Sequence, residues 1–193
     1  MVSHDAERTG QLRSQGLEPG QDETKQETLN PELQRGWLLS MLFDNRASMR
    51  RYILRSALIS FLPSMIIVLI LSASGIMTEE RAPTFEGDPL VILLMVVVIG
   101  PPIETLLMVP ILWILSFITK REIPLAAISA CIWAGFHSLL ASAWGLGIIW
   151  PFFVFSCSYL TWRKRSFWRA ILITSCIHSL QNLIPGIVAV FAQ

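Results

Sequence analysis

Charged side chains are scarce in this chain, and they are scarcest in its second half. Only 15% of the 193 residues are Asp, Glu, Lys or Arg, against roughly 25% in an ordinary soluble domain. Residues 90–193 hold eight of the 29 charged side chains, which is too few to cover a water-exposed surface. The net charge of only +1 excludes a basic nucleic-acid-binding protein, so we expect no nucleic-acid partner. With 53% hydrophobic residues, the composition indicates an integral membrane protein whose surroundings are the lipid bilayer.

Cysteine is also scarce. Cys131, Cys157 and Cys176 lie inside apolar runs without paired spacing. This spacing excludes a disulfide framework and a Cys-x-x-Cys metal site, and it favours small buried thiols. We also expect no hydrophobic signal sequence in this stretch, because residues 1–36 are polar. We expect this stretch to be a disordered tail, since it has too little apolar surface to offset the entropy of ordering it.

Apolar runs dominate the rest of the chain. Residues 37–55 combine a short apolar run with several arginines, which predicts an interfacial helix followed by a basic flank. Residues 56–193 are expected to form a membrane domain, because a helix needs about 20 mostly apolar residues to cross a bilayer. Five stretches meet this requirement: Ser56–Ile76, Leu90–Ile118, Ile123–Ala143, Trp144–Trp162 and Ala170–Ala192. The sequence therefore predicts an all-α, multi-pass membrane protein with five spans.

The basic residues between the spans predict the orientation of the chain. Arginines precede the first span, Lys120 and Arg121 follow the second, and a basic cluster at residues 163–169 precedes the fifth. The loop at residues 77–89 is acidic by contrast. Since basic residues concentrate on the cytoplasmic side of a membrane, we expect a cytoplasmic N-terminus and a location in the plasma membrane.

One carboxylate and two histidines lie within the predicted spans, each on a different helix. At 1.5 Å per helical residue, Glu104 and His137 lie roughly 22 Å from the cytoplasmic ends of their spans, and His178 lies roughly 13 to 18 Å from its own. The sequence Gly-Pro-Pro at residues 100–102 predicts an interrupted helix, with Glu104 in the first turn of the resumed segment. Because ionisable groups are costly in hydrocarbon, we expect these three side chains to share one site.

Two further residues share a helix face with the histidines. Trp133 stands four residues before His137, and Asn182 stands four residues after His178. Asn182 could orient His178 or donate to a developing negative charge. Trp133 could form a wall of the site and contact a substrate. Each residue taken singly is also compatible with ordinary helix packing, so the combination carries the hypothesis.

These patterns resemble the motifs of the intramembrane CAAX proteases and bacteriocin-processing enzymes, the CPBP or Abi family. Trp133 through His137 matches that family's Phe or Trp-x-x-x-His motif, and His178 through Asn182 matches its His-x-x-x-Asn motif. The resemblance covers about residues 90–182 and keeps the order of the motifs. It implies a helical membrane domain with a central intramembrane cavity of conical shape.

The first motif of that family, Glu-Glu-x-x-x-Arg, is incomplete in this chain. Glu104 matches the first Glu, whereas Thr105 stands at the second Glu and Val109 at the Arg. The two absent side chains would lie four residues apart on one helix face, which is the spacing of an ion pair. Loss of both partners can be nearly neutral, whereas loss of one leaves a buried charge unpaired. The departure is compatible with retained reacting groups and with altered activity.

The resemblance implies an intramembrane endopeptidase that cleaves membrane-associated or lipidated peptides near their C-terminus. By this resemblance, Glu104 and His137 would activate a water molecule for attack on the scissile carbonyl. His178 and Asn182 would stabilise the oxyanion that forms. The expected partners are a peptide or protein substrate and the bilayer, and no cofactor is required.

Two other hypotheses stay open. Glu104, His137 and His178 match the ligand count of a catalytic zinc site, although the chain lacks a His-Glu-x-x-His motif and would have no second carboxylate as base. From a different class comes a non-catalytic membrane protein that confers immunity to a bacteriocin or binds a peptide, which the incomplete first motif favours. A small transporter fits less well, because no internal repeat is evident and the number of spans is odd.

Overall fold

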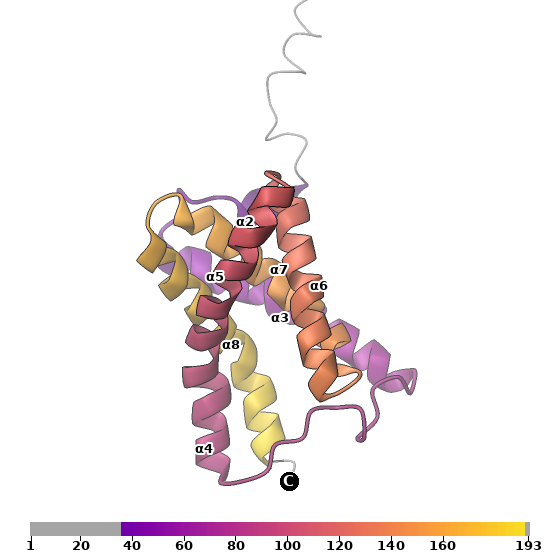
Figure 1. Ribbon diagram of the computed structural model, residues 1–193. Coiled ribbons are helices and arrows are strands. Elements are labelled where there is room, and N and C mark those ends of the chain that lie inside the picture. Colours follow the sequence, from indigo (N-terminus) through magenta and orange to yellow (C-terminus); the bar gives the residue numbers. More distant parts are fainter. Residues whose placement is uncertain (1–35, 192–193) are drawn as a thin grey trace, which may run out of the picture. The chain divides into compact units, whose positions relative to one another are not determined.

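The computed structural model describes residues 36–191, so the tail expected at residues 1–36 lies outside the described part except for Gly36 (Figure 1). Within the described residues all regular structure is helical, and five helices are long and apolar enough to cross a membrane. The predicted all-α, multi-pass membrane fold is confirmed. The elements are α2 (Trp37–Leu42), α3 (Met49–Ala73), α4 (Pro89–Leu94), the π-helical turn η1 (Met95–Ile99), α5 (Gly100–Ile118), α6 (Glu122–Leu140), α7 (Trp144–Arg163) and α8 (Phe167–Phe191).

The first spanning helix begins earlier than its hydropathy predicts. α3 starts at Met49 rather than at Ser56, so much of the expected basic flank is helical. The guanidinium group of Arg55 donates to the carbonyl of Met41 and lies 3.7 Å from the carboxylate of Asp44. An arginine with such partners can stay near the interface while its helix continues into the membrane. A criterion based on apolar residues alone therefore begins the span too late.

α3 presents apolar side chains outward and small polar ones inward. Four exposed side chains follow one another at four-residue spacing along its outer face: Leu54, Leu58, Leu62 and Ile66. Four buried side chains repeat at the same spacing along its inner face: Tyr52, Ser56, Ser60 and Ser64. A helix on the surface of a soluble protein has the opposite arrangement. The exposed leucines therefore indicate contact with acyl chains, and the serines allow neighbouring helices to approach closely.

α7 is the central helix of the described bundle. Nearly all of its residues from 151 to 162 are buried, and it packs against α3, α6 and α8. The indole of Trp150 donates to the carbonyl of Ile59 in α3 at 2.8 Å. That carbonyl lacks its usual helical donor because Pro63, four residues later, has no N–H group. A side chain of α7 therefore replaces the missing backbone donor of α3 and joins the two helices.

The basic segments and the acidic loop lie at opposite ends of the helices. At one end, the ammonium group of Lys164 lies 2.5 Å from the carboxylate of Glu122, which joins the start of α6 to the end of α7. At the other end, the amide of Ala143 donates to the carbonyl of Arg81 at 3.1 Å. The loop at residues 74–88 therefore contacts the turn between α6 and α7.

α6 and α7 approach each other closely beside that turn. A β-carbon at Gly145, in the first turn of α7, would overlap the carbonyl oxygen of Ala134 and the hydroxyl of Ser138 on α6. Glycine permits this approach because it has no side chain. The close contact holds the ring of Trp144 against that of His137, with centroids 4.7 Å apart.

We expect Gly145→Ala to lower the free energy of unfolding by about 1 to 3 kcal/mol, because an added methyl group forces the two helices apart. Gly135→Ala on α6 is the matched control, since a β-carbon there would meet no atom within 4 Å. Alanine is favoured over glycine in a helix by about 1 kcal/mol, so the control should be neutral or stabilising. Unfolding in mixed detergent micelles measures both effects, and equal stability of the two variants would contradict the close packing.

Candidate active site

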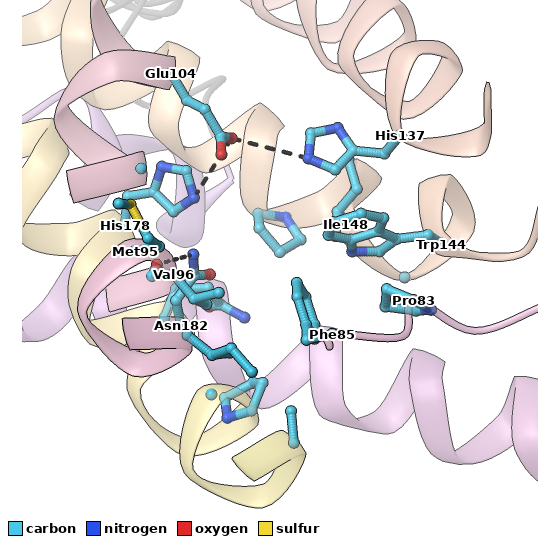
Figure 2. A pocket seen from close by; sticks show the side chains of 18 of the residues that line it. Pro83, Phe85, Met95, Val96, Glu104, His137, Trp144, Ile148, His178 and Asn182 are labelled. Carbon is cyan, nitrogen blue, oxygen red and sulfur yellow. Dashed lines mark hydrogen bonds and ion pairs between the residues drawn. The ribbon is translucent and has the colours of Figure 1, made fainter. Parts of the chain in front are cut away.

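Glu104, His137 and His178 come together inside the helical bundle, although they belong to α5, α6 and α8. The Oε2 atom of Glu104 lies 3.8 Å from Nε2 of His137 and 3.9 Å from Nε2 of His178. Figure 2 shows both rings pointing toward this carboxylate. Within the described residues Oε2 has no hydrogen-bond partner. The carboxylate is therefore flanked by two imidazoles at distances that exceed a direct hydrogen bond of about 3 Å.

Glu104 follows an interruption of the second span. In the turn η1 the amide of Gly100 donates to the carbonyl of Met95, five residues earlier. A β-carbon at Gly100 would lie 2.9 Å from that oxygen, so another residue would force the turn to shift. Pro101 and Pro102 then form the first turn of α5, and their missing N–H groups remove donors from the carbonyls of the preceding turn. The interruption expected from the Gly-Pro-Pro sequence thus takes the form of a π turn just before the carboxylate.

The ring of His137 is held in one tautomer by its own helix. Its Nδ1 lies 2.9 Å from the carbonyl oxygen of Trp133. A carbonyl can only accept a hydrogen bond, so Nδ1 carries the proton. In the neutral ring, Nε2 then presents its lone pair to Glu104. Two acceptor atoms face each other, an arrangement that a shared proton or a bridging water molecule stabilises.

Aromatic rings enclose both histidines. His178 stacks on Phe155 with centroids 4.3 Å apart, and His137 meets the edge of Trp144 at 4.7 Å. Phe152 lies 5.3 Å from the ring of His137 and 5.5 Å from that of His178. All three aromatic residues belong to the central helix α7. They limit rotation of the imidazoles and exclude solvent from one side of the site.

Trp133 lies behind this aromatic wall. Its indole stacks on Phe152 at 4.8 Å, and only 6% of the residue is exposed. Trp144, rather than Trp133, is among the described residues that line the cavity. Trp133 acts through its carbonyl, which orients His137, and through the support that it gives to Phe152. Direct contact between its side chain and a substrate stays a prediction.

Asn182 shares a face of α8 with His178, and its amide holds the second span. Its Nδ2 donates to the carbonyl of Val96 at 3.0 Å (Figure 2). Val96 needs this donor because the amide of Gly100 is directed one residue further back and Pro101 has no N–H group. One N–H of Asn182 is therefore committed to the π turn. Since an amide has two such donors, a contact with an oxyanion stays a prediction.

A cavity of about 680 Å³ extends from these residues to the loop between α3 and α4. Glu104, His137 and His178 line one end, and Figure 2 shows Pro83 and Phe85 of the loop at the other. The lining is mostly apolar, and its charged members among the described residues are all acidic: Glu86, Asp88 and Glu104. The volume is that of a site for a small molecule or a short peptide segment, about 300 to 1,000 Å³.

The carboxylate and the two imidazoles are spaced more widely than the ligands of a bound zinc ion. Bonds of about 2.1 Å to nitrogen and oxygen would place tetrahedral ligand atoms about 3.4 Å apart. Oε2 of Glu104 is 3.8 and 3.9 Å from the two imidazole nitrogens. Across residues 36–191, no group of three or more His, Cys, Asp or Glu side chains is arranged to hold a metal ion. A reaction that requires no metal stays a prediction.

Several residues of the cavity do not belong to any of the sequence motifs. Gln181 and Ser64 line it beside Asn182, and Trp144 and Phe155 line it beside the histidines. Gln181 could have been identified from the sequence, because a polar amide is costly in an apolar span and indicates a position with a specific role. The two aromatic residues give none, since such residues are frequent in all the spans.

No protein-family model, curated protein or solved structure matches this chain. The function is therefore inferred from the motifs and from the geometry of the cavity.

We expect Asn182→Leu to reduce the free energy of unfolding by about 1 to 2 kcal/mol, because it leaves the carbonyl of Val96 without a donor inside the membrane. Ser116→Ala is the control. The hydroxyl of Ser116 donates to the carbonyl of Trp113 in the same helix, and this carbonyl keeps its backbone donor when the hydroxyl is removed. Thermal unfolding in micelles compares the two variants. A loss that is no greater for Asn182→Leu than for the control would show that the π turn does not depend on this contact.

Proposed function

We propose that this protein is an intramembrane endopeptidase that uses Glu104 and His137 to activate a water molecule. The observation that carries the proposal is the meeting of one carboxylate and two imidazoles, from three helices, at the end of a cavity between membrane spans. Ionisable groups at such depth are costly and mark sites of chemistry or of ligand binding. The motifs that resemble those of CAAX proteases and bacteriocin-processing enzymes support the same reaction.

In this reaction Glu104 and His137 share one water molecule. The water donates to the carboxylate, and the lone pair of Nε2 in His137 accepts its second hydrogen or holds its orientation. The carboxylate takes a proton as the water oxygen attacks the scissile carbonyl carbon. The C–N bond then breaks as this proton passes from the carboxyl group of Glu104 to the leaving nitrogen. The products are an amine and a carboxylic acid, and the acid gives its proton to the amine or to water. Proton transfer by positioned groups accelerates such a reaction about 10² to 10⁴-fold.

His178 stabilises the negative charge that develops on the carbonyl oxygen. His178 lines the cavity with its Nε2 3.9 Å from Oε2 of Glu104, and Phe155 holds its ring in place by stacking. When protonated, Nε2 donates to the oxyanion, and the second N–H of Asn182 adds a donor. One such donor contributes about 3 to 4 kcal/mol to the stability of the transition state.

The proposed substrate is a membrane-associated or lipidated peptide, as the resemblance to the CAAX proteases implies. We propose that the N-terminus lies in the cytoplasm, because the basic segments lie at one end of the helices. We also propose that the membrane is the plasma membrane. The cavity extends to the opposite end, where the loop at residues 83–88 lines it. The scissile segment would then enter from the extracytoplasmic side.

The second candidate is a non-catalytic protein that binds a peptide or confers immunity. The first motif raises this candidate, because Thr105 and Val109 stand where the enzymes that the chain resembles have Glu and Arg. Both side chains pack toward the interior, and the hydroxyl of Thr105 has no partner among the described side chains. The replacement leaves no unpaired charge beside Glu104, so it is compatible with either candidate.

We expect Glu104→Gln, His137→Ala and His178→Ala each to lower the rate of peptide cleavage by a factor of about 10² or more, because each removes a group that transfers a proton or stabilises charge. The measurement is mass spectrometry of the peptide termini released in membranes that contain each variant. Glu122→Gln is the matched control, since this carboxylate pairs with Lys164 away from the cavity.

Full activity in all three variants would exclude the peptidase, and correctly folded protein with no cleavage in any form would support the binding protein. The same membranes decide the metal question. Activity lost in chelator and restored by zinc would replace the metal-free mechanism with a zinc mechanism, whereas undiminished activity in chelator retains it.

The side from which the cavity is reached predicts the labelling of introduced cysteines. In a background where Cys131, Cys157 and Cys176 are replaced by alanine, a membrane-impermeant maleimide should label Thr84→Cys in intact cells. Thr119→Cys, at the basic end, should be labelled after permeabilisation alone. Labelling at Thr84→Cys should also block cleavage, because this residue lines the cavity. The reverse labelling pattern would place the loop in the cytoplasm.

A further inference from the structure

A buried amide lies in the cavity close to His178. Gln181 lines the cavity and is only 5% exposed. Its Nε2 donates to the hydroxyl of Ser64 on α3 at 3.1 Å, whereas its Oε1 has no hydrogen-bond partner within the described residues. A buried polar atom without a partner is costly in a membrane, where neither lipid nor apolar side chains can donate.

The surroundings of Gln181 distinguish it from its neighbour Asn182. The amide of Asn182 repairs a broken backbone, because it donates to the carbonyl of Val96. The hydroxyl of Ser64 needs no such repair, since a serine in a helix can bond to its own backbone. Pro185 follows four residues after Gln181 and cannot donate to its backbone carbonyl. Gln181 therefore has two acceptors, its side-chain Oε1 and its backbone carbonyl oxygen, in a part of α8 that provides few donors.

The position of Gln181 along the cavity fits a bound peptide. It lies three residues beyond His178 on the same helix face, about 4.5 Å further along α8. An extended chain advances about 3.3 Å per residue. A peptide that has its scissile carbonyl at Glu104 and His178, and runs toward the loop, therefore passes Gln181 after one or two residues.

We propose that Gln181 binds the substrate backbone: its Oε1 accepts the N–H of a residue one or two positions from the scissile bond. This inference rests on the proposed peptidase function and narrows its substrate class to peptides that enter in an extended form. Ser64 holds the amide so that Oε1 is the atom left to accept. A proline at the bound position lacks the required N–H and is expected to be excluded.

The test uses an uncleavable probe whose register is fixed. A fluorescein-labelled pseudopeptide of leucines carries a ketomethylene group in place of its central peptide bond, so its ketone occupies the position of the scissile carbonyl. In each analogue one N–H is replaced by an ester oxygen. Binding to the full chain in nanodiscs is measured by fluorescence anisotropy for wild type, Gln181→Met and Ser64→Ala.

We expect one ester, one or two residues from the ketone, to weaken binding to wild type about three- to tenfold, as the loss of one hydrogen bond predicts. In Gln181→Met the same ester should have no effect, whereas Ser64→Ala should keep most of it. If Gln181→Met does not fold, Gln181→Asn takes its place, because the shorter side chain withdraws the oxygen. An ester effect that is the same in wild type and in the Gln181 variant, or that occurs at no position, would overturn the inference.

The outcome separates this inference from the proposed function. If an ester effect at one position depends on Gln181 but the protein cleaves no peptide, the backbone contact is supported and the peptidase is excluded. Cleavage that depends on Glu104 without such coupling would retain the peptidase and exclude the contact. If the ketone pseudopeptide does not bind at all, both are wrong.

Discussion

A backbone carbonyl inside a bilayer has no water to bond, and this constraint explains where the helices of the protein are joined. Pro63 removes the helical donor of Ile59, and the indole of Trp150 supplies another at 2.8 Å. The π turn before α5 does the same to Val96, and the amide of Asn182 supplies its donor at 3.0 Å. In both places a side chain from another span repairs the break, so the interruptions bind the bundle together.

The second of these repairs also arranges the candidate site. The π turn ends where α5 begins, one turn before Glu104, and its donor Asn182 stands one turn after His178. The contact that satisfies a carbonyl therefore also sets the carboxylate beside one imidazole. The position of the other imidazole, that of His137, depends on a different contact. Glycine at position 145 lets α7 approach α6, and the ring of Trp144 then supports His137.

The features that the sequence predicted depend on regular spacing, and those that it missed depend on tertiary contacts. Apolar runs located the five spans, and a constant helical rise brought Glu104 to the depth of the two histidines. The start of α3 was missed because the partners of Arg55 lie in the preceding segment. Trp144 was missed as a wall because it approaches His137 only after the turn between α6 and α7 closes. The hydrogen bond from Asn182 to Val96 depends on a π turn, and the periodicity of the sequence does not predict such a turn.

The residues that depart from the first motif lie on a different face of α5 from Glu104. Successive helical residues point about 100° apart, so Glu104 faces the cavity while Thr105, only 2% exposed, packs inward. Val109 lies one turn further on, partly buried against the core. The absent pair of charges would therefore have belonged to the packing face of the helix and not to the face that meets the two imidazoles. Replacing both by uncharged residues removes a buried ion pair that packing can substitute. On this reasoning, the proposed catalysis would depend on the cavity face alone, and the composition of the packing face would not decide it.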